Sequence, residues 1–177
     1  MKRAALIAAL ALAAPATAQA EQTFTYTGLR PASAQITRVL PMALAYWKAH
    51  NVNGCDAGVN ARVADHPLLD GKPVDGSSAL GSCEITLNSE IGARSEAPPA
   101  RKRGAKYDSR RFGAALSCAV VFHEVGHALG LDHLADPNAR GLMQAFGVSW
   151  DVVPFECRVW ANHVMQAPNF KAARGKR

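Results

Sequence analysis

Apolar positions recur at helical spacing in two stretches of the chain, residues 33–49 and residues 113–129, and this pattern predicts two helices. Pro41 lies inside the first stretch. It predicts a kink or a restart there, because proline removes one helical hydrogen bond. Pro154 can occupy the first turn of a last helix that runs to about Met165.

Alternating apolar and polar positions predict strands in three other places. Residues 22–27 alternate threonine with aromatic residues, and residues 82–87 alternate polar with apolar ones. A further strand is predicted near residues 58–64, within a stretch rich in Asn, Asp and Gly that otherwise indicates loops. Residues 92–111 are basic and are interpreted as a surface loop. Strands interspersed with helices predict an α/β fold.

The first twenty residues have the layout of a secretory signal peptide. Lys2 and Arg3 precede an apolar run over residues 4–14, which is too short to span a bilayer, and small residues follow up to Ala20. An ordinary alanine-rich helix is the alternative explanation. We therefore expect residues 1–20 to be removed on export, which places the mature protein outside the cell or in a periplasm.

The remaining residues, 21–177, have the length and composition of a single globular domain. The whole chain is 49% hydrophobic and 19% charged, which disfavours a disordered protein. Removal of residues 1–20 takes two of the 20 basic side chains and none of the 14 acidic ones, leaving a net charge of +4. This mild basicity does not predict a nucleic-acid partner, and no later segment is long and apolar enough to predict membrane insertion.

Three histidines and one glutamate follow one another around the end of the second predicted helix. His123 and His127 lie one helical turn apart on one face, so both imidazoles can reach one metal ion. Gly130 can adopt a positive φ, which would end the helix and turn the chain so that His133 returns as a third ligand. Three protein nitrogens leave one tetrahedral position open, so a single catalytic Zn²⁺ is predicted.

Glu124 directly follows the first of these histidines and is the candidate catalytic residue. Zinc lowers the pKa of a bound water toward ~7, and a neighbouring carboxylate can act as general base and then as general acid. The less specific explanations are ordinary histidines on a helix, or a structural zinc without catalysis. A structural site usually has a fourth protein ligand.

The pattern H-E-x-x-H-x-x-G-x-x-H, from His123 to His133, resembles the extended zinc signature of the metzincin metallopeptidases. Met143 follows soon after and resembles the methionine of that clan's Met-turn. The short gap between the two is most similar to the matrixin, or matrix-metalloproteinase-like, branch. The resemblance implies a zincin-like catalytic domain with a twisted mixed sheet, mostly parallel and backed by the first and active-site helices. It also implies a C-terminal helix and a substrate cleft above the zinc, in which Gly130 and Met143 support the site.

The chain departs from the resembling families at two positions near the site. Leu134 stands where matrixins often have Ser or Thr, which leaves the subfamily open. Ala145 stands where astacin-like and serralysin-like members have a tyrosine, so no tyrosine donor is expected there. Calcium is an alternative use of four aspartates, but turn chemistry accounts for them without a bound ion. The four are Asp56, Asp65, Asp70 and Asp75.

Four cysteines in an exported chain predict two disulfides, with three possible connectivities. Cys118 lies five residues before His123, about 140° around the helix, and would therefore face away from the metal. Cys157 on the last helix is its preferred partner, which leaves Cys55 to pair with Cys83. A zinc site made of four cysteines would need close pairs that this chain lacks.

These observations predict a secreted zinc-dependent endopeptidase that hydrolyses peptide bonds by zinc-activated water, with Glu124 as general base and acid. Protein or peptide substrates and a monomeric state are expected. Two alternatives remain open, which are a zinc hydrolase acting on cell-wall peptide amides and a non-catalytic zinc-binding module.

Overall fold

Strands and helices are interspersed in the computed structural model, which describes residues 23–91, 109–136, 141–144 and 150–166. The elements in chain order are β1 (Phe24–Pro31), α1 (Ala34–Ala49), β2 (Asn60–Leu69), β3 (Lys72–Pro73), β4 (Gly76–Ser77), β5 (Glu84–Asn88), α3 (Ser109–Ala128), the 3₁₀ turn η1 (Trp150–Val152) and α4 (Phe155–Gln166). The predicted α/β class is confirmed at this level. The expected signal peptide and most of the basic segment 92–111 lie outside the described residues.

The five strands form one mixed sheet in the order β1-β2-β5-β4, with β3 paired to β2 off this path. Only β2 and β5 are parallel among the pairings that the structure describes. The expectation of a mostly parallel sheet is therefore wrong. Strand β2 begins beside the end of β1, where Pro31 lies opposite Arg62, so the two strands run in opposite directions although a helix separates them in sequence.

Strand β1 is longer than its predicted range and is irregular. Its pairing with β2 shifts register twice, between Thr25 and Thr27 and between Thr27 and Arg30. Opposite the first shift, His66 has a φ of 50°, a left-handed conformation of the kind found at bulges. The two shorter strands, β3 and β4, have two residues each and were not predicted, because two residues carry no detectable alternation.

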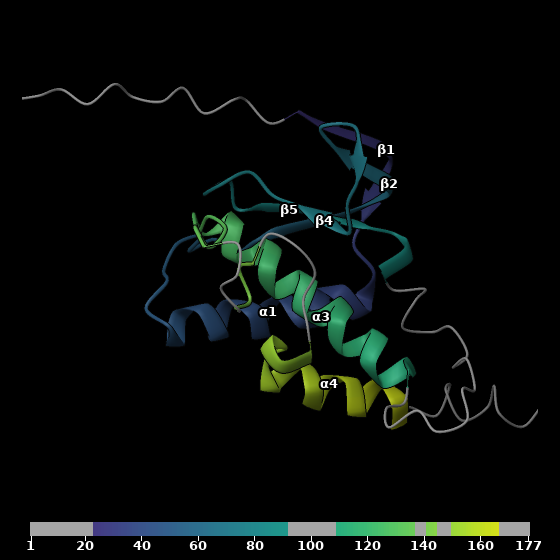
Figure 1. The fold of residues 1–177 in the computed structure, drawn as a ribbon, viewed down its shortest axis with the longest axis vertical. Helices are drawn as coiled ribbons and strands as arrows, with labels where there is room; N and C mark the ends of the chain where they lie inside the picture. The colour runs from purple at the N-terminus through teal and green to yellow at the C-terminus, as the bar shows by residue number, and fades with distance from the viewer. Residues whose placement is uncertain (1–22, 92–108, 137–140, 145–149, 167–177) are drawn as a thin grey trace, which may run out of the picture.

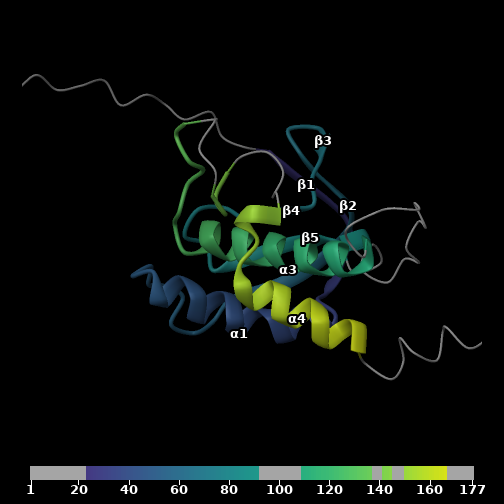
Figure 2. The same cartoon turned by 60° about the horizontal axis from the view of Figure 1, so that its bottom comes forward.

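Helix α3 lies between the sheet and helix α4, and α1 packs beside it (Figures 1 and 2). Helix α1 begins at the N-cap Ser33, whose hydroxyl accepts a hydrogen bond from the Ile36 amide. The helix is continuous through the exposed Pro41. Burial of the apolar face on both sides of the proline offsets the lost hydrogen bond, which costs about 3 kcal/mol or more.

The hydrophobic core is concentrated around α3. From residue 114 to residue 128 almost all side chains of this helix are buried, so it is a core helix rather than an amphipathic surface helix. Apolar residues of α1 and β5 complete this core; they include Val39, Ala43, Trp47, Ile85 and Leu87. Buried polar residues in such a helix require a compensating partner, and α3 has three of them near its C-terminal end. No helix among the described residues is long and apolar enough to cross a membrane.

Candidate metal centre

Three polar side chains are buried in the last two turns of α3. His123 is 9% exposed, Glu124 is 5% exposed and His127 is 8% exposed. A buried imidazole or carboxylate that makes no compensating interaction costs several kcal/mol. Their concentration in the otherwise apolar stretch 118–128 therefore indicates a site rather than a packing role.

The end of α3 is set by a glycine that reverses the chain. Gly130 has a φ of 98°, in the left-handed region that favours glycine. Its amide donates to the His127 carbonyl at 2.8 Å, and the Leu131 amide donates to the Gly126 carbonyl at 2.9 Å. This pair of hydrogen bonds is a Schellman motif. The helix therefore stops, and the chain turns so that His133 comes back toward the helix.

The three histidines then converge through their Nε2 atoms. The Nε2 separations are 3.0 Å for His123 and His127, 3.1 Å for His127 and His133, and 3.3 Å for His123 and His133. Nitrogens bound tetrahedrally to zinc at about 2.0–2.1 Å would lie about 3.3–3.4 Å apart. Among the described residues, these three form the group of metal-ligating side chains close enough to hold one ion.

Two of the three imidazoles are fixed in the tautomer that a metal requires. The Nδ1 atom of His123 lies 2.7 Å from the Leu142 carbonyl oxygen, and that of His127 lies 2.7 Å from the Leu131 carbonyl oxygen. Each Nδ1 must carry the proton, because a carbonyl oxygen only accepts. In the neutral rings both Nε2 atoms then present lone pairs to each other. A cation between them removes this repulsion, so the donor set fits a metal ion.

Burial keeps these imidazoles neutral. It lowers the pKa of His123 to about 4, with the neighbouring His127 and His133 adding to the effect, although the hydrogen bond to Leu142 opposes it. Burial also lowers the pKa of His127. Neutral imidazole is the form that binds metals, so at neutral pH both rings are ready to do so.

Glu124 is buried beside the first ligand without full hydrogen bonding. Its Oε2 atom has no hydrogen-bond partner among the described residues. Burial, together with the charge of Asp75, raises the pKa of Glu124 to about 8. An unpartnered buried carboxyl oxygen calls for an explanation, and proton exchange with a bound molecule is one that fits its position.

Met143 lies directly under the metal-binding helix. It is 5% exposed, and its backbone carbonyl accepts a hydrogen bond from the Leu134 amide at 2.9 Å. This bond ties the segment after His133 to the turn at Met143. A Cβ at Gly126 would lie 2.6 Å from Met143 Sδ, so the thioether packs against a helical position without a side chain.

Two disulfides hold α3 in place. Cys118 is bonded to Cys157 of α4, and Cys55 is bonded to Cys83, which are the pairs favoured from the sequence. The Cys83 amide also donates to the Ala128 carbonyl at 3.3 Å. One disulfide therefore links the middle of α3 to α4, and the other lies at the C-terminal end of the helix.

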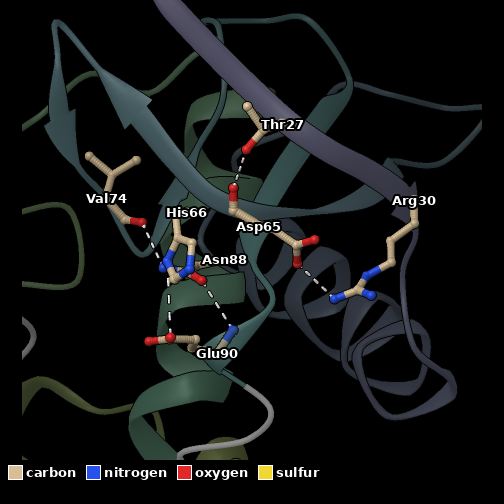
Figure 3. Close-up of polar contacts among 7 residues, drawn as sticks. All are labelled: Thr27, Arg30, Asp65, His66, Val74, Asn88 and Glu90. Atoms are coloured by element: carbon tan, nitrogen blue, oxygen red, sulfur yellow. Dashed lines mark hydrogen bonds and ion pairs between the residues drawn. The ribbon is translucent and has the colours of Figure 1, made fainter.

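Two of the four aspartates considered for calcium are bound to other protein groups. Asp65 forms an ion pair with Arg30 at 2.9 Å (Figure 3), and Asp70 accepts a hydrogen bond from the Thr23 amide at 3.0 Å. Asp75 lies close enough to Glu124 to influence its pKa. Among the described residues, no three of these aspartates have ligand atoms close enough together to hold an ion.

The sequence did not predict two residues that contact the metal-binding helix from distant parts of the chain. Trp47 of α1 donates its indole N–H to the Phe122 carbonyl at 2.7 Å, although the two residues are 75 positions apart. Gly76 of β4 lies against Glu124. Neither has a sequence signal of its own, since a tryptophan in an apolar helix and a glycine in a loop are both ordinary.

Comparison with protein-family models gives no match for this chain, and comparison with curated proteins gives none. Only the geometry of the site and the resemblance of its motif therefore indicate a function for this chain.

Proposed function

We propose that this protein is a zinc-dependent endopeptidase of the metzincin type, most similar to the matrixin branch. The observation that carries the proposal is the convergence of three Nε2 atoms, to within 3.3 Å of one another, beside a buried glutamate with an unpartnered oxygen. Three imidazoles with one open position are typical of catalytic zinc sites. The Met143 turn and the glycine that ends α3 support the same family.

His123, His127 and His133 would hold the ion, with the Leu142 and Leu131 carbonyls orienting the first two rings. Bound zinc would lower the pKa of a coordinated water and polarise the scissile carbonyl. Glu124 then does the proton transfer. A cation held by the histidines would favour the ionised carboxylate, whose Oε2 would accept a proton from the attacking water and later deliver it to the leaving amine.

A peptide is the substrate that the surroundings of Glu124 favour. Strand β4 is the last strand of the described sheet on its side, and its Gly76 lies against Glu124. An extended peptide can add to such an edge through main-chain hydrogen bonds, and this would bring its backbone close to the general base. The proposal includes a monomeric enzyme without a nucleic-acid partner.

Export fits the chemistry of the cysteines. Disulfides persist in oxidising compartments, and both disulfides of the structure are compatible with an extracellular or periplasmic protein. We include the signal peptide over residues 1–20 in the proposal. The protein should therefore be produced with these residues in place, so that export and disulfide formation can occur.

The test is hydrolysis of casein, gelatin and cell-wall peptides by the exported protein, before and after removal of metal with a chelator. We expect cleavage of the protein substrates that the chelator abolishes and added zinc restores. Cleavage confined to wall peptides would instead identify an amide hydrolase of the cell wall. A folded, zinc-loaded protein that cleaves none of these substrates would point to a non-catalytic zinc-binding module.

A further inference from the structure

Strand β4 places a residue without a side chain directly against Glu124. A Cβ at Gly76 would lie 2.7 Å from Glu124 Cγ, 2.9 Å from its Oε1 and 3.0 Å from its Cδ. Non-bonded carbon atoms pack best at about 3.5–4.0 Å. The Glu124 side chain therefore occupies the space that any larger residue at position 76 would need.

Pairing with β5 holds Gly76 on the helix side of the sheet. Gly76 pairs with Leu87, and the next residue, Ser77, pairs with Thr86. Leu87 is fully buried in the core. Since side chains alternate between the two faces of a strand, Ser77 points to the opposite face from Glu124.

That opposite face is held by a hydrogen bond from β1. The Tyr26 hydroxyl lies 3.0 Å from the Ser77 hydroxyl, and Ser77 is 4% exposed. Strand β4 therefore lies between this hydrogen bond on its outer face and Glu124 on its inner face. A two-residue edge strand has few pairing bonds of its own, so such contacts matter for its position.

Asn88 fixes the residues just before Gly76. Its backbone amide donates to the Asp75 carbonyl at 2.9 Å, and its side-chain amide donates to the Val74 carbonyl at 3.4 Å (Figure 3). Asn88 itself is 6% exposed. The segment from residue 74 to residue 77 is thus held on both sides of Gly76.

We propose that Gly76 is a positioning residue for Glu124. Contacts of Tyr26 and Asn88 hold this part of β4 in place. The absence of a side chain at position 76 then sets where the Glu124 carboxylate lies relative to the three histidine nitrogens. The catalytic consequence rests on the proposed peptidase function. The steric relation does not, because it follows from the contacts of Gly76 alone.

Alanine at position 76 provides a clean perturbation. Gly76 does not have a positive φ, so alanine needs no left-handed backbone there, and the three atoms nearest to its methyl group all belong to the Glu124 side chain. General acid–base catalysis contributes roughly 10²–10⁴-fold, which is the most that a displaced Glu124 can lose. We expect Gly76→Ala to lower kcat by about 10-fold or more, up to this limit, and Gly76→Val to lower it further. KM and zinc affinity should stay unchanged.

Two comparisons separate positioning from general damage. Gly58→Ala introduces backbone strain, since Gly58 has a φ of 93°, but its Cβ meets nothing within 4 Å. It should lower stability and leave kcat unchanged. In a Glu124→Gln background, Gly76→Ala should cause no further loss of rate, because a residue that acts through Glu124 has nothing left to position.

The decisive readout without activity is a crystal structure of zinc-loaded Gly76→Ala beside the wild type. A displaced Glu124 carboxylate with an unchanged triangle of histidine nitrogens supports the proposal, whether or not the protein cleaves peptides. A Glu124 that keeps its position in Gly76→Ala overturns it. A wild-type kcat in both Gly76→Ala and Gly76→Val also overturns it, whereas an inactive wild type refutes only the peptidase function.

Discussion

Gly126 lies between the two helical ligands. Its replacement by alanine has two opposing effects on stability, a gain in helix propensity and a cost in core packing. Alanine favours a helix interior over glycine by about 0.8–1.0 kcal/mol. The added Cβ would, however, lie 2.6 Å from Met143 Sδ and 3.0 Å from Trp47 Cζ2. Extra carbon in a well-packed core costs about 1–3 kcal/mol.

The geometry places the packing cost in the upper part of this range. The methionine could move, but Trp47 is held by its hydrogen bond to the Phe122 carbonyl at 2.7 Å. Met143 and Trp47, which come from different segments, must therefore both move to accommodate the methyl group. We expect Gly126→Ala to lower the free energy of unfolding of the metal-free protein by a net of about 1–2 kcal/mol.

Urea unfolding of the metal-free protein measures this directly. The midpoint should fall while the m-value stays constant, because the unfolded surface does not change. Zinc affinity should fall as well, since the strain lies between His123 and His127. In a Met143→Ala background, which removes the closer contact, the cost of Gly126→Ala should shrink. A Gly126→Ala protein more stable than wild type by about 0.8–1.0 kcal/mol, the helix propensity alone, would refute the packing argument.

Three further changes test other parts of the structure. Gly130→Ala should cost about 1–2 kcal/mol in urea unfolding and weaken zinc binding, because a φ of 98° is unfavourable for alanine; unchanged stability would contradict this. Trp47→Phe should cost about 0.5–1.5 kcal/mol through the lost hydrogen bond to Phe122, and a loss below the error of the unfolding measurement would count against that bond. Glu124→Gln should stabilise the metal-free protein, and this gain should increase from pH 4.5 to pH 8. The folded state raises the pKa of Glu124 from 4.5 to about 8. The folded wild type therefore binds more protons than its unfolded chain in this window, and it loses stability as the pH rises. A difference in unfolding free energy between Glu124→Gln and wild type that does not change with pH would show that the carboxyl is not held neutral.

The parts of the site that could be predicted are those that depend on local geometry. Two histidines one turn apart share a helix face wherever the helix lies. A glycine after them permits the chain reversal that the structure shows at Gly130, with its φ of 98°. The direction of Cys118 around the same helix also predicted a disulfide cysteine rather than a metal ligand, and the structure pairs it with Cys157.

The parts that could not be predicted depend on contacts between distant segments. The direction of β1 relative to β2 depends on where the chain re-enters the sheet after α1. The pattern of residues along the chain does not predict that point of re-entry. Gly76 and Glu124 are 48 positions apart, and their contact exists because β4 lies over α3. The irregular pairing around His66 likewise depends on the register of two strands.

One comparison tests whether Glu124 moves the proton in zinc-dependent peptide hydrolysis. The measurement is kcat/KM for peptide cleavage by wild type and Glu124→Gln, each loaded with one zinc per chain. We expect kcat/KM to fall by roughly 10²–10⁴-fold or more in the variant at equal zinc content, because a general acid–base group is removed. Cleavage by Glu124→Gln at the wild-type rate would contradict the mechanism.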